Sequence, residues 1–257
     1  MGEVRLERVG EATLLIIDRP AVHNAISRDT MTELDVAIDE VAASDTRVLA
    51  IRGAGERTFV SGGDLKELAA IREHPDAVAM ALRMRGLCDK IATLPIPVVA
   101  AINGNAFGGG CETAVACDFR IAVETARLAF NQIDLAIMPA WGGIERLQAL
   151  VGRARALYLM TTGHPLVARD AYAWGLVEEV VSPESFDTRL HQLLERMSSA
   201  PRAALTGIKA TACRAQNPAR PELAAQAAAA FADTWIADEH WSAVERAQAG
   251  RARRRTG

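Results

Sequence analysis

The stretch Ile102-Asn103-Gly104-Asn105-Ala106-Phe107-Gly108-Gly109-Gly110-Cys111-Glu112 joins a predicted buried strand to a predicted helix. The apolar run 96–101 precedes it, and the small, apolar residues 111–116 follow it. Three consecutive glycines allow the backbone to approach a ligand closely, because no Cβ stands in the way. The N–H groups that begin a helix are unpaired and lie at the positive end of the helix dipole. This turn can therefore stabilise an anion, and the carboxylate of Glu112 stands beside it.

A second turn of the same kind lies earlier in the chain. Phe59-Val60-Ser61-Gly62-Gly63-Asp64-Leu65 follows a strand predicted over 47–52 and opens another predicted helix. Two such turns can each direct one backbone N–H at a single oxygen, which is the geometry of an oxyanion hole built from main chain. The pair therefore indicates a site for an oxygen that becomes negative during a reaction.

Other short motifs occur in order along the chain. Asp18-Arg19-Pro20-Ala21-Val22-His23-Asn24-Ala25 lies near the start, and Pro139-Ala140-Trp141-Gly142-Gly143 and Gly175-Leu176-Val177 follow the second glycine turn. Together with the two turns, these motifs resemble the signatures of the crotonase superfamily of enoyl-CoA hydratases and isomerases. The resemblance extends over nearly the whole chain.

Strands alternate with helices up to about residue 185, which indicates an α/β fold, and no strand is predicted after Glu184. The resemblance implies a crotonase-like spiral of ββα repeats over residues 1–198, which would carry the coenzyme A and acyl site. It also implies a helical region over residues 199–257 that packs around a homotrimer or hexamer. The apolar helix that carries Phe231 and Trp235 favours this assembly, since a monomer would leave a large apolar surface exposed.

The resemblance also implies roles for individual residues. The backbone N–H groups of Gly63 and Gly109 would be the oxyanion donors, and Glu112 matches the first of two glutamates that family hydratases place around a water. The position of the second glutamate, counted back from Pro139, holds Gln132. An amide cannot shuttle a proton at neutral pH, although it can orient water or substrate.

The loss of one glutamate leaves the reaction open. If the segment around Gln132 is extended, Asp134 points to the same side and can replace the missing carboxylate. Double-bond isomerisation needs only one proton shuttle. Decarboxylation of a methyl- or ethylmalonyl-type acyl-CoA needs only the oxyanion hole and a proton donor, and short pieces such as Cys117-Asp118-Phe119-Arg120 resemble the ethylmalonyl-CoA decarboxylase branch. A non-catalytic CoA-binding homologue is a further alternative.

An acyl-CoA thioester is the partner that the resemblance implies. Arg57 and Lys66 would lie near its phosphates, and the backbone at Ala25, Ser61 and Gly63 would lie along the pantetheine, with Lys209 as a further candidate. Ala140 and Trp141 would line the acyl group. The bulky ring of Trp141 either narrows the acyl pocket or fills the core.

Composition excludes several other classes of function. The 257 residues carry a formal charge of −3, and the basic residues between 66 and 90 are offset by acidic ones, so no nucleic-acid partner is expected. No apolar run is long enough to span a membrane, and the first 20 residues lack a signal-peptide core. Four cysteines without CxxC spacing and five scattered histidines suggest no metal. We therefore expect a cytoplasmic protein that needs no cofactor, because coenzyme A is part of its substrate.

Overall fold

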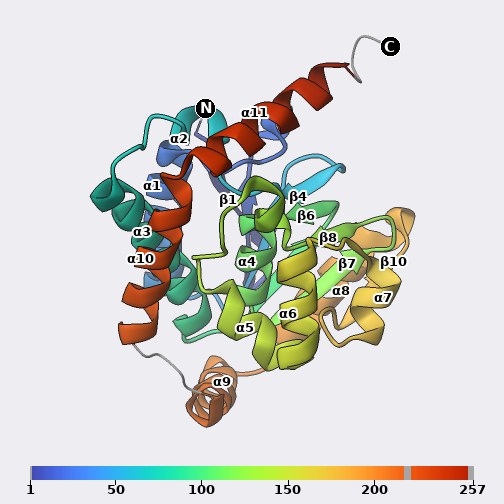
Figure 1. Cartoon of the computed structure of the whole chain (residues 1–257). Helices are drawn as coiled ribbons and strands as arrows, with labels where there is room; N and C mark the ends of the chain where they lie inside the picture. Colours follow the sequence, from blue (N-terminus) through green and yellow to red (C-terminus); the bar gives the residue numbers. More distant parts are fainter. Residues whose placement is uncertain (1, 217–220, 254–257) are drawn as a thin grey trace.

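The computed structural model describes residues 2–216 and 221–253, and Figure 1 shows their arrangement. The strands are β1 (Val4–Val9), β2 (Ala12–Ile17), β3 (Val48–Gly53), β4 (Thr58–Val60), β5 (Val98–Ile102), β6 (Asn105–Phe107), β7 (Phe119–Val123), β8 (Arg127–Ala129), β9 (Leu166–Val167) and β10 (Glu179–Val181). The α-helices are α1 (Arg28–Ala43), α2 (Leu65–Leu68), α3 (His74–Thr93), α4 (Gly109–Ala116), α5 (Gly143–Val151), α6 (Arg153–Thr162), α7 (Ala168–Ala173), α8 (Phe186–Ser198), α9 (Arg202–Gln216), α10 (Pro221–Trp235) and α11 (Asp238–Arg253). Short 3₁₀ helices are η1 (Pro20–Val22), η2 (Asn131–Leu135) and η3 (Pro183–Ser185).

The strands form two sheets that the chain visits in turn. One sheet has the order β1-β2-β3-β5-β7-β10, and the other has the order β4-β6-β8-β9. Three successive strand pairs, β3–β4, β5–β6 and β7–β8, each contribute one strand to each sheet and are followed by helices. This confirms the α/β fold and the spiral of ββα repeats that the resemblance implies. The sequence alone predicts neither the second sheet nor its short strands.

The large sheet contains the strands predicted over 47–52 and 96–101, which correspond to β3 and β5. The hairpin β1–β2 is antiparallel, whereas β3, β5 and β7 run parallel to one another. Every residue of β2 and β5 is buried, which matches their continuous apolar sequences, since strands covered on both faces need no polar positions. The two glycine turns follow β4 and β6, the short strands of the second sheet that come directly after β3 and β5 in the chain.

Proline and glycine set limits of three helices. Pro75 lies in the first turn of α3, where its missing N–H costs nothing, and so it favours the start of the helix at this point. Gly152 separates α5 from α6, and its φ of +80° favours glycine.

The C-terminal helices pack back onto the same chain. Helix α10 lies along α3 (Figure 1), and Phe231 and Trp235 are only 4% and 2% exposed. The Trp235 Nε1 donates to the carbonyl of Ile71 at 2.9 Å. The prediction that a monomer would expose these aromatic rings is wrong, because α3 and its neighbours already cover them. The oligomeric state itself stays a prediction.

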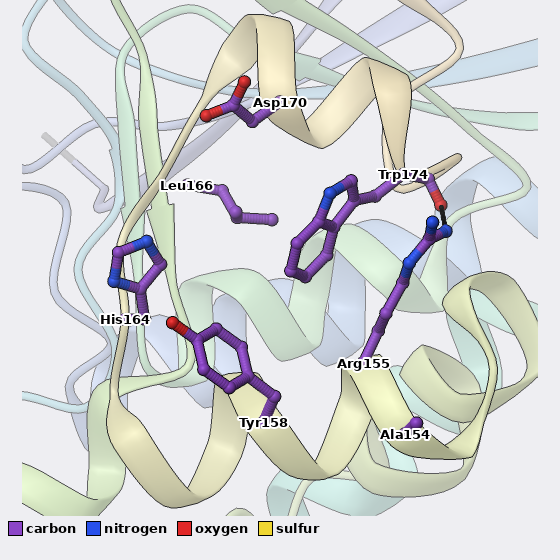
Figure 2. Close-up of a pocket in the computed structure, with 7 residues that line it drawn as sticks. All are labelled: Ala154, Arg155, Tyr158, His164, Leu166, Asp170 and Trp174. Atoms are coloured by element: carbon purple, nitrogen blue, oxygen red, sulfur yellow. Dashed lines mark hydrogen bonds between the residues drawn. The ribbon is translucent and has the colours of Figure 1, made fainter.

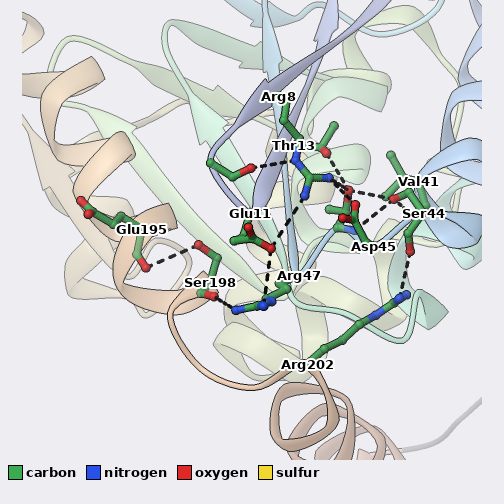
Figure 3. Close-up of polar contacts among 12 residues, drawn as sticks. Arg8, Glu11, Thr13, Val41, Ser44, Asp45, Arg47, Glu195, Ser198 and Arg202 are labelled. Atoms are coloured by element: carbon green, nitrogen blue, oxygen red, sulfur yellow. Dashed lines mark hydrogen bonds and ion pairs between the residues drawn. The ribbon is translucent and has the colours of Figure 1, made fainter.

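Arginine side chains join the start of the C-terminal region to the connection between α1 and β3 (Figure 3). Arg47 donates to the carbonyl of Ser198 at 3.1 Å, and Arg202 donates to the carbonyl of Ser44 at 2.9 Å. Lys209 on α9 is buried and pairs with Asp118 at 2.6 Å, so its amine is used within the chain rather than by coenzyme A. Over residues 2–216 and 221–253, no helix is both long and apolar enough to cross a membrane.

Candidate functional site

The fold brings the two glycine turns into contact. A Cβ built on Gly62 would lie 3.3 Å from the amide nitrogen of Gly109, and a Cβ built on Gly110 would lie 1.9 Å from the carbonyl oxygen of Val60. Larger residues at Gly110 would force the two turns apart. The glycines of both turns are thus explained by close backbone approach, and the predicted proximity of Gly63 and Gly109 follows from it.

The backbone N–H groups of Gly63 and Gly109, the two predicted donors, take no part in the hydrogen bonds of the turns around them. Ile26 donates to the carbonyl of Gly62 at 2.8 Å and accepts from the amide of Asp64 at 2.9 Å, and this bridge passes over Gly63. Gly109 is the first residue of α4, so its amide precedes the i→i−4 bonds of the helix. Both amides are therefore placed to serve an outside acceptor.

Glu112 is buried in the first turn of α4, at 1% exposure. Its Oε2 accepts from the backbone amides of Trp141 at 2.8 Å and Gly143 at 2.9 Å, and its Oε1 accepts from Nε2 of Gln132 at 2.9 Å. Burial raises the pKa of Glu112 to about 7, although these three donors oppose the rise by stabilising the carboxylate. A carboxyl group with this pKa can both take and give a proton near neutral pH.

The segment around Gly143 holds Glu112 in place. A Cβ on Gly143 would lie 2.5 Å from Cγ of Glu112, so this position accepts only glycine. Arg146 donates to the carbonyl of Trp141 at 3.1 Å and pairs with Asp89. The sequence does not show that Gly143 contacts Glu112. It shows only that Gly143 belongs to the Pro139–Gly143 motif.

Gln132 lies where the sequence predicts and faces Glu112, but Asp134 does not lie on the same side. Residues 131–135 form the 3₁₀ helix η2 rather than an extended strand, and in such a helix positions two apart point in different directions. Gln132 is accordingly buried while Asp134 is exposed. The idea that Asp134 replaces the missing glutamate is therefore wrong. The Oε1 of Gln132 is buried without a hydrogen-bond partner in the described chain, and so it can accept from a bound water or substrate.

The predicted coenzyme A contacts are more scattered. Arg57 is exposed just before β4, Lys66 is exposed on α2, and Ser61 is half-buried after β4. The carbonyl of Ala25 already accepts from Arg19 at 2.5 Å. Ala140 is buried next to Trp141.

Arg19 is a structural residue of the site that sequence reasoning missed. Its guanidinium pairs with Asp64 at 3.0 Å and with Glu3 at 2.8 Å. Asp64 in turn accepts from the amide of Lys66 at 3.2 Å and caps α2. Arg19 thus ties the first signature motif to the turn that carries Gly63. The Asp-Arg-Pro motif marks Arg19 as a residue of interest, but the motif does not show that Arg19 pairs with Asp64.

A separate cavity of about 450 Å³ lies between α6, β9 and α7 (Figure 2). Its wall includes Tyr158, His164 and Trp174, and the guanidinium of Arg155 stacks 5.2 Å from the Trp174 ring. No predicted site residue lines this cavity. Among the residues that the structure describes, no group of three or more histidine, cysteine or acidic side chains is arranged to hold a metal ion.

Comparisons with known proteins agree with the observed fold. A sequence profile described as enoyl-CoA hydratase/isomerase matches residues 9–247. The short-chain-enoyl-CoA hydratase of Clostridium acetobutylicum is 36% identical over 201 residues, which cover 77% of this chain and 76% of that protein. The crotonyl-CoA hydratase of Syntrophomonas wolfei is 36% identical over 211 residues, covering 80% of each. The crystal structure of enoyl-CoA hydratase from Bacillus anthracis superimposes with a TM-score of 0.81 at 33% identity, covering 88% of this chain and 89% of that one.

Proposed function

The chain belongs to the enoyl-CoA hydratase/isomerase family of acyl-CoA enzymes, and from that premise we propose that it moves a proton along an enoyl-CoA thioester with one carboxylate. The amides of Gly63 and Gly109 would hold the thioester oxygen, and Glu112 would be the acid/base group. This makes the protein an enoyl-CoA isomerase rather than an efficient hydratase.

The chemistry follows from the placement of these groups. Removing a proton from the carbon next to a thioester carbonyl leaves an enolate with a negative oxygen. Two preorganised N–H donors stabilise that oxygen more than they stabilise the neutral carbonyl, and this difference lowers the barrier. For a 3-enoyl-CoA, Glu112 takes the proton from C2, the double bond moves to C2–C3, and the same proton is returned to C4.

The single observation that carries the proposal is that Glu112 faces the side-chain amide of Gln132 and not a second carboxylate. Hydration requires water to lose a proton while a carbon gains one, and family hydratases divide this work between two carboxylates. Gln132 occupies the second position here and donates a hydrogen bond to Glu112. Its partnerless Oε1 can hold a water in place but cannot take a proton from it. Isomerisation needs no such second base.

The direct test compares three substrates with the purified protein. A 3-enoyl-CoA should be isomerised faster than crotonyl-CoA is hydrated. If methyl- or ethylmalonyl-CoA loses carbon dioxide faster than either reaction proceeds, the decarboxylase alternative replaces isomerisation, because the same enolate would be formed without a base. Binding of acyl-CoA with no turnover of any substrate would leave a non-catalytic homologue.

Replacing Gln132 with glutamate should raise the hydration of crotonyl-CoA by about 10-fold or more, since it supplies the second acid/base group. Isomerisation should not gain, because it uses Glu112 alone. The measurement is kcat/KM for both reactions in the wild type and in Gln132→Glu.

Asp134→Asn is the matched control for this substitution, because Asp134 lies two residues away and is exposed. It should change neither rate. Hydration by the wild type near the diffusional ceiling of about 10⁸ M⁻¹s⁻¹ would contradict the proposal, since a single carboxylate would then suffice.

We further propose that the protein assembles as a homotrimer or hexamer. Ile208 on α9 remains 69% exposed, and α9 stands at the edge of the molecule (Figure 1), so an apolar side chain is available there for a neighbouring subunit. Sedimentation should give three or six times the chain mass of 27.5 kDa. A stable 27.5 kDa species at micromolar concentration would exclude this assembly.

A further inference from the structure

The indole ring of Trp141 lies against both predicted oxyanion glycines. A Cβ built on Gly109 would lie 2.1, 2.3 and 2.6 Å from three carbons of its benzene ring, Cζ3, Cη2 and Cε3. A Cβ built on Gly63 would lie 3.9 Å from Cζ2 of the same ring and 2.9 Å from Cδ1 of Leu68. The ring therefore covers the Cα of Gly109 and reaches the neighbourhood of Gly63.

The backbone that carries this ring is fixed on both sides. The amide of Trp141 donates to Glu112 at 2.8 Å, and its carbonyl accepts from Arg146 at 3.1 Å. Arg146 is held in turn by an ion pair with Asp89, and Asp89 also pairs with the buried Arg85 at 3.2 Å. The side chain of Trp141 is 7% exposed. A ring on so constrained a backbone cannot retreat far without disturbing Glu112.

We propose that Trp141 is the specificity-determining residue of the acyl site and restricts it to short acyl chains. This inference rests on the proposed function, in which the thioester oxygen lies between the amides of Gly63 and Gly109. The acyl chain must leave the carbonyl beside these two glycines, and the indole occupies space next to one of them. A short chain of about four carbons passes the ring, whereas a long chain collides with it. The apolar ring and Leu68 also keep the oxyanion in surroundings of low polarity, where two N–H donors act more strongly.

The test measures the binding of two non-hydrolysable ketone analogues, those of butanoyl-CoA and decanoyl-CoA, by calorimetry. The wild type should favour the four-carbon analogue. Trp141→Ala should shift the ratio of the two dissociation constants toward the ten-carbon analogue by about 10-fold or more, since a pocket that gains room for several methylene groups discriminates less against them. Trp141→Phe should retain most of the wild-type ratio, because it keeps an aromatic wall.

Trp174→Ala is the control, since Trp174 lines the separate cavity of Figure 2 and should leave the ratio unchanged. An unchanged ratio in Trp141→Ala would overturn the inference while leaving the proposed acyl-CoA chemistry intact. Failure of the wild type to bind either analogue would instead overturn the proposed function, and the inference with it. Each outcome is distinguishable because both analogues carry the same coenzyme A portion.

Discussion

Replacing Glu112 with glutamine is expected to lower kcat/KM for acyl-CoA turnover by about 10²–10⁴-fold without unfolding the protein. The amide cannot take or return a proton, so the loss falls on the chemical step. The new side chain fits the site, because its oxygen can still accept from the amides of Trp141 and Gly143. Its nitrogen can donate to Gln132 if the side-chain amide of Gln132 rotates by 180°. The rotation brings the buried Oε1 of Gln132 to that nitrogen and gives it a hydrogen-bond partner. Steady-state kinetics on a 3-enoyl-CoA checks the prediction.

The same variant should change how stability depends on pH. The pKa of Glu112 is about 7 in the folded chain, against an ordinary value of 4.5. Between these values the folded state binds more protons than the unfolded state, so the free energy of unfolding falls as pH rises from about 4.5 to 7 and is level above that. Glu112→Gln removes this dependence, and its stability relative to the wild type should rise by roughly 3 kcal/mol between pH 4 and pH 8.

Denaturant unfolding at a series of pH values measures this difference directly. Glu124→Gln is a suitable control, since Glu124 is exposed and takes no part in the hydrogen bonds of Glu112. Identical pH profiles for Glu112→Gln and the wild type would show that Glu112 is not the group with the raised pKa. Full activity in Glu112→Gln would remove its acid/base role altogether.

Sequence patterns predict the parts of this site whose residues lie close together along the chain. The two glycine turns and the first-turn carboxylate are visible because strand, turn and helix signals follow one another within about ten residues. Gln132 was placed correctly because its distance from Pro139 is fixed along the chain. The error at Asp134 arose because a five-residue 3₁₀ helix has no periodicity that a sequence can reveal.

Contacts between distant segments could not be predicted in the same way. Nothing in the sequence shows that the amides of Trp141 and Gly143 bind Glu112, or that Arg19 reaches Asp64, because these pairings are set by the fold. The apolar face of α10 was visible from its composition. Its partner was not, since an apolar helix face packs equally well on its own chain or on another. Here α3 of the same chain covers it.

The second large effect is expected at Gly109. There, the effect of losing the backbone N–H group can be measured separately from the effect of adding a side chain. Gly109→Ala keeps the N–H group but places a methyl group about where Trp141 stands, so the turn or the ring must move and activity should fall steeply. Gly109→Pro removes the N–H group and collides with Trp141 as well, so a loss in that variant alone has two causes. The Trp141→Ala background removes the collision for both replacements.

In that background, Gly109→Pro should be about 10²–10³-fold less active in kcat/KM than Gly109→Ala, since the two variants then differ chiefly in one oxyanion donor. Proline is tolerated at the first position of a helix, which Gly109 occupies in α4, so the proline variant should fold. Gly63→Ala in the wild-type background is the companion measurement. Its methyl group would be crowded by the flexible end of Leu68 at 2.9 Å and would touch Trp141 at 3.9 Å, and its amide would remain, so it should lose far less activity than Gly109→Ala. Equal rates for proline and alanine at position 109 would mean that the stabilising N–H comes from elsewhere, and the oxyanion site would have to be sought away from the start of α4.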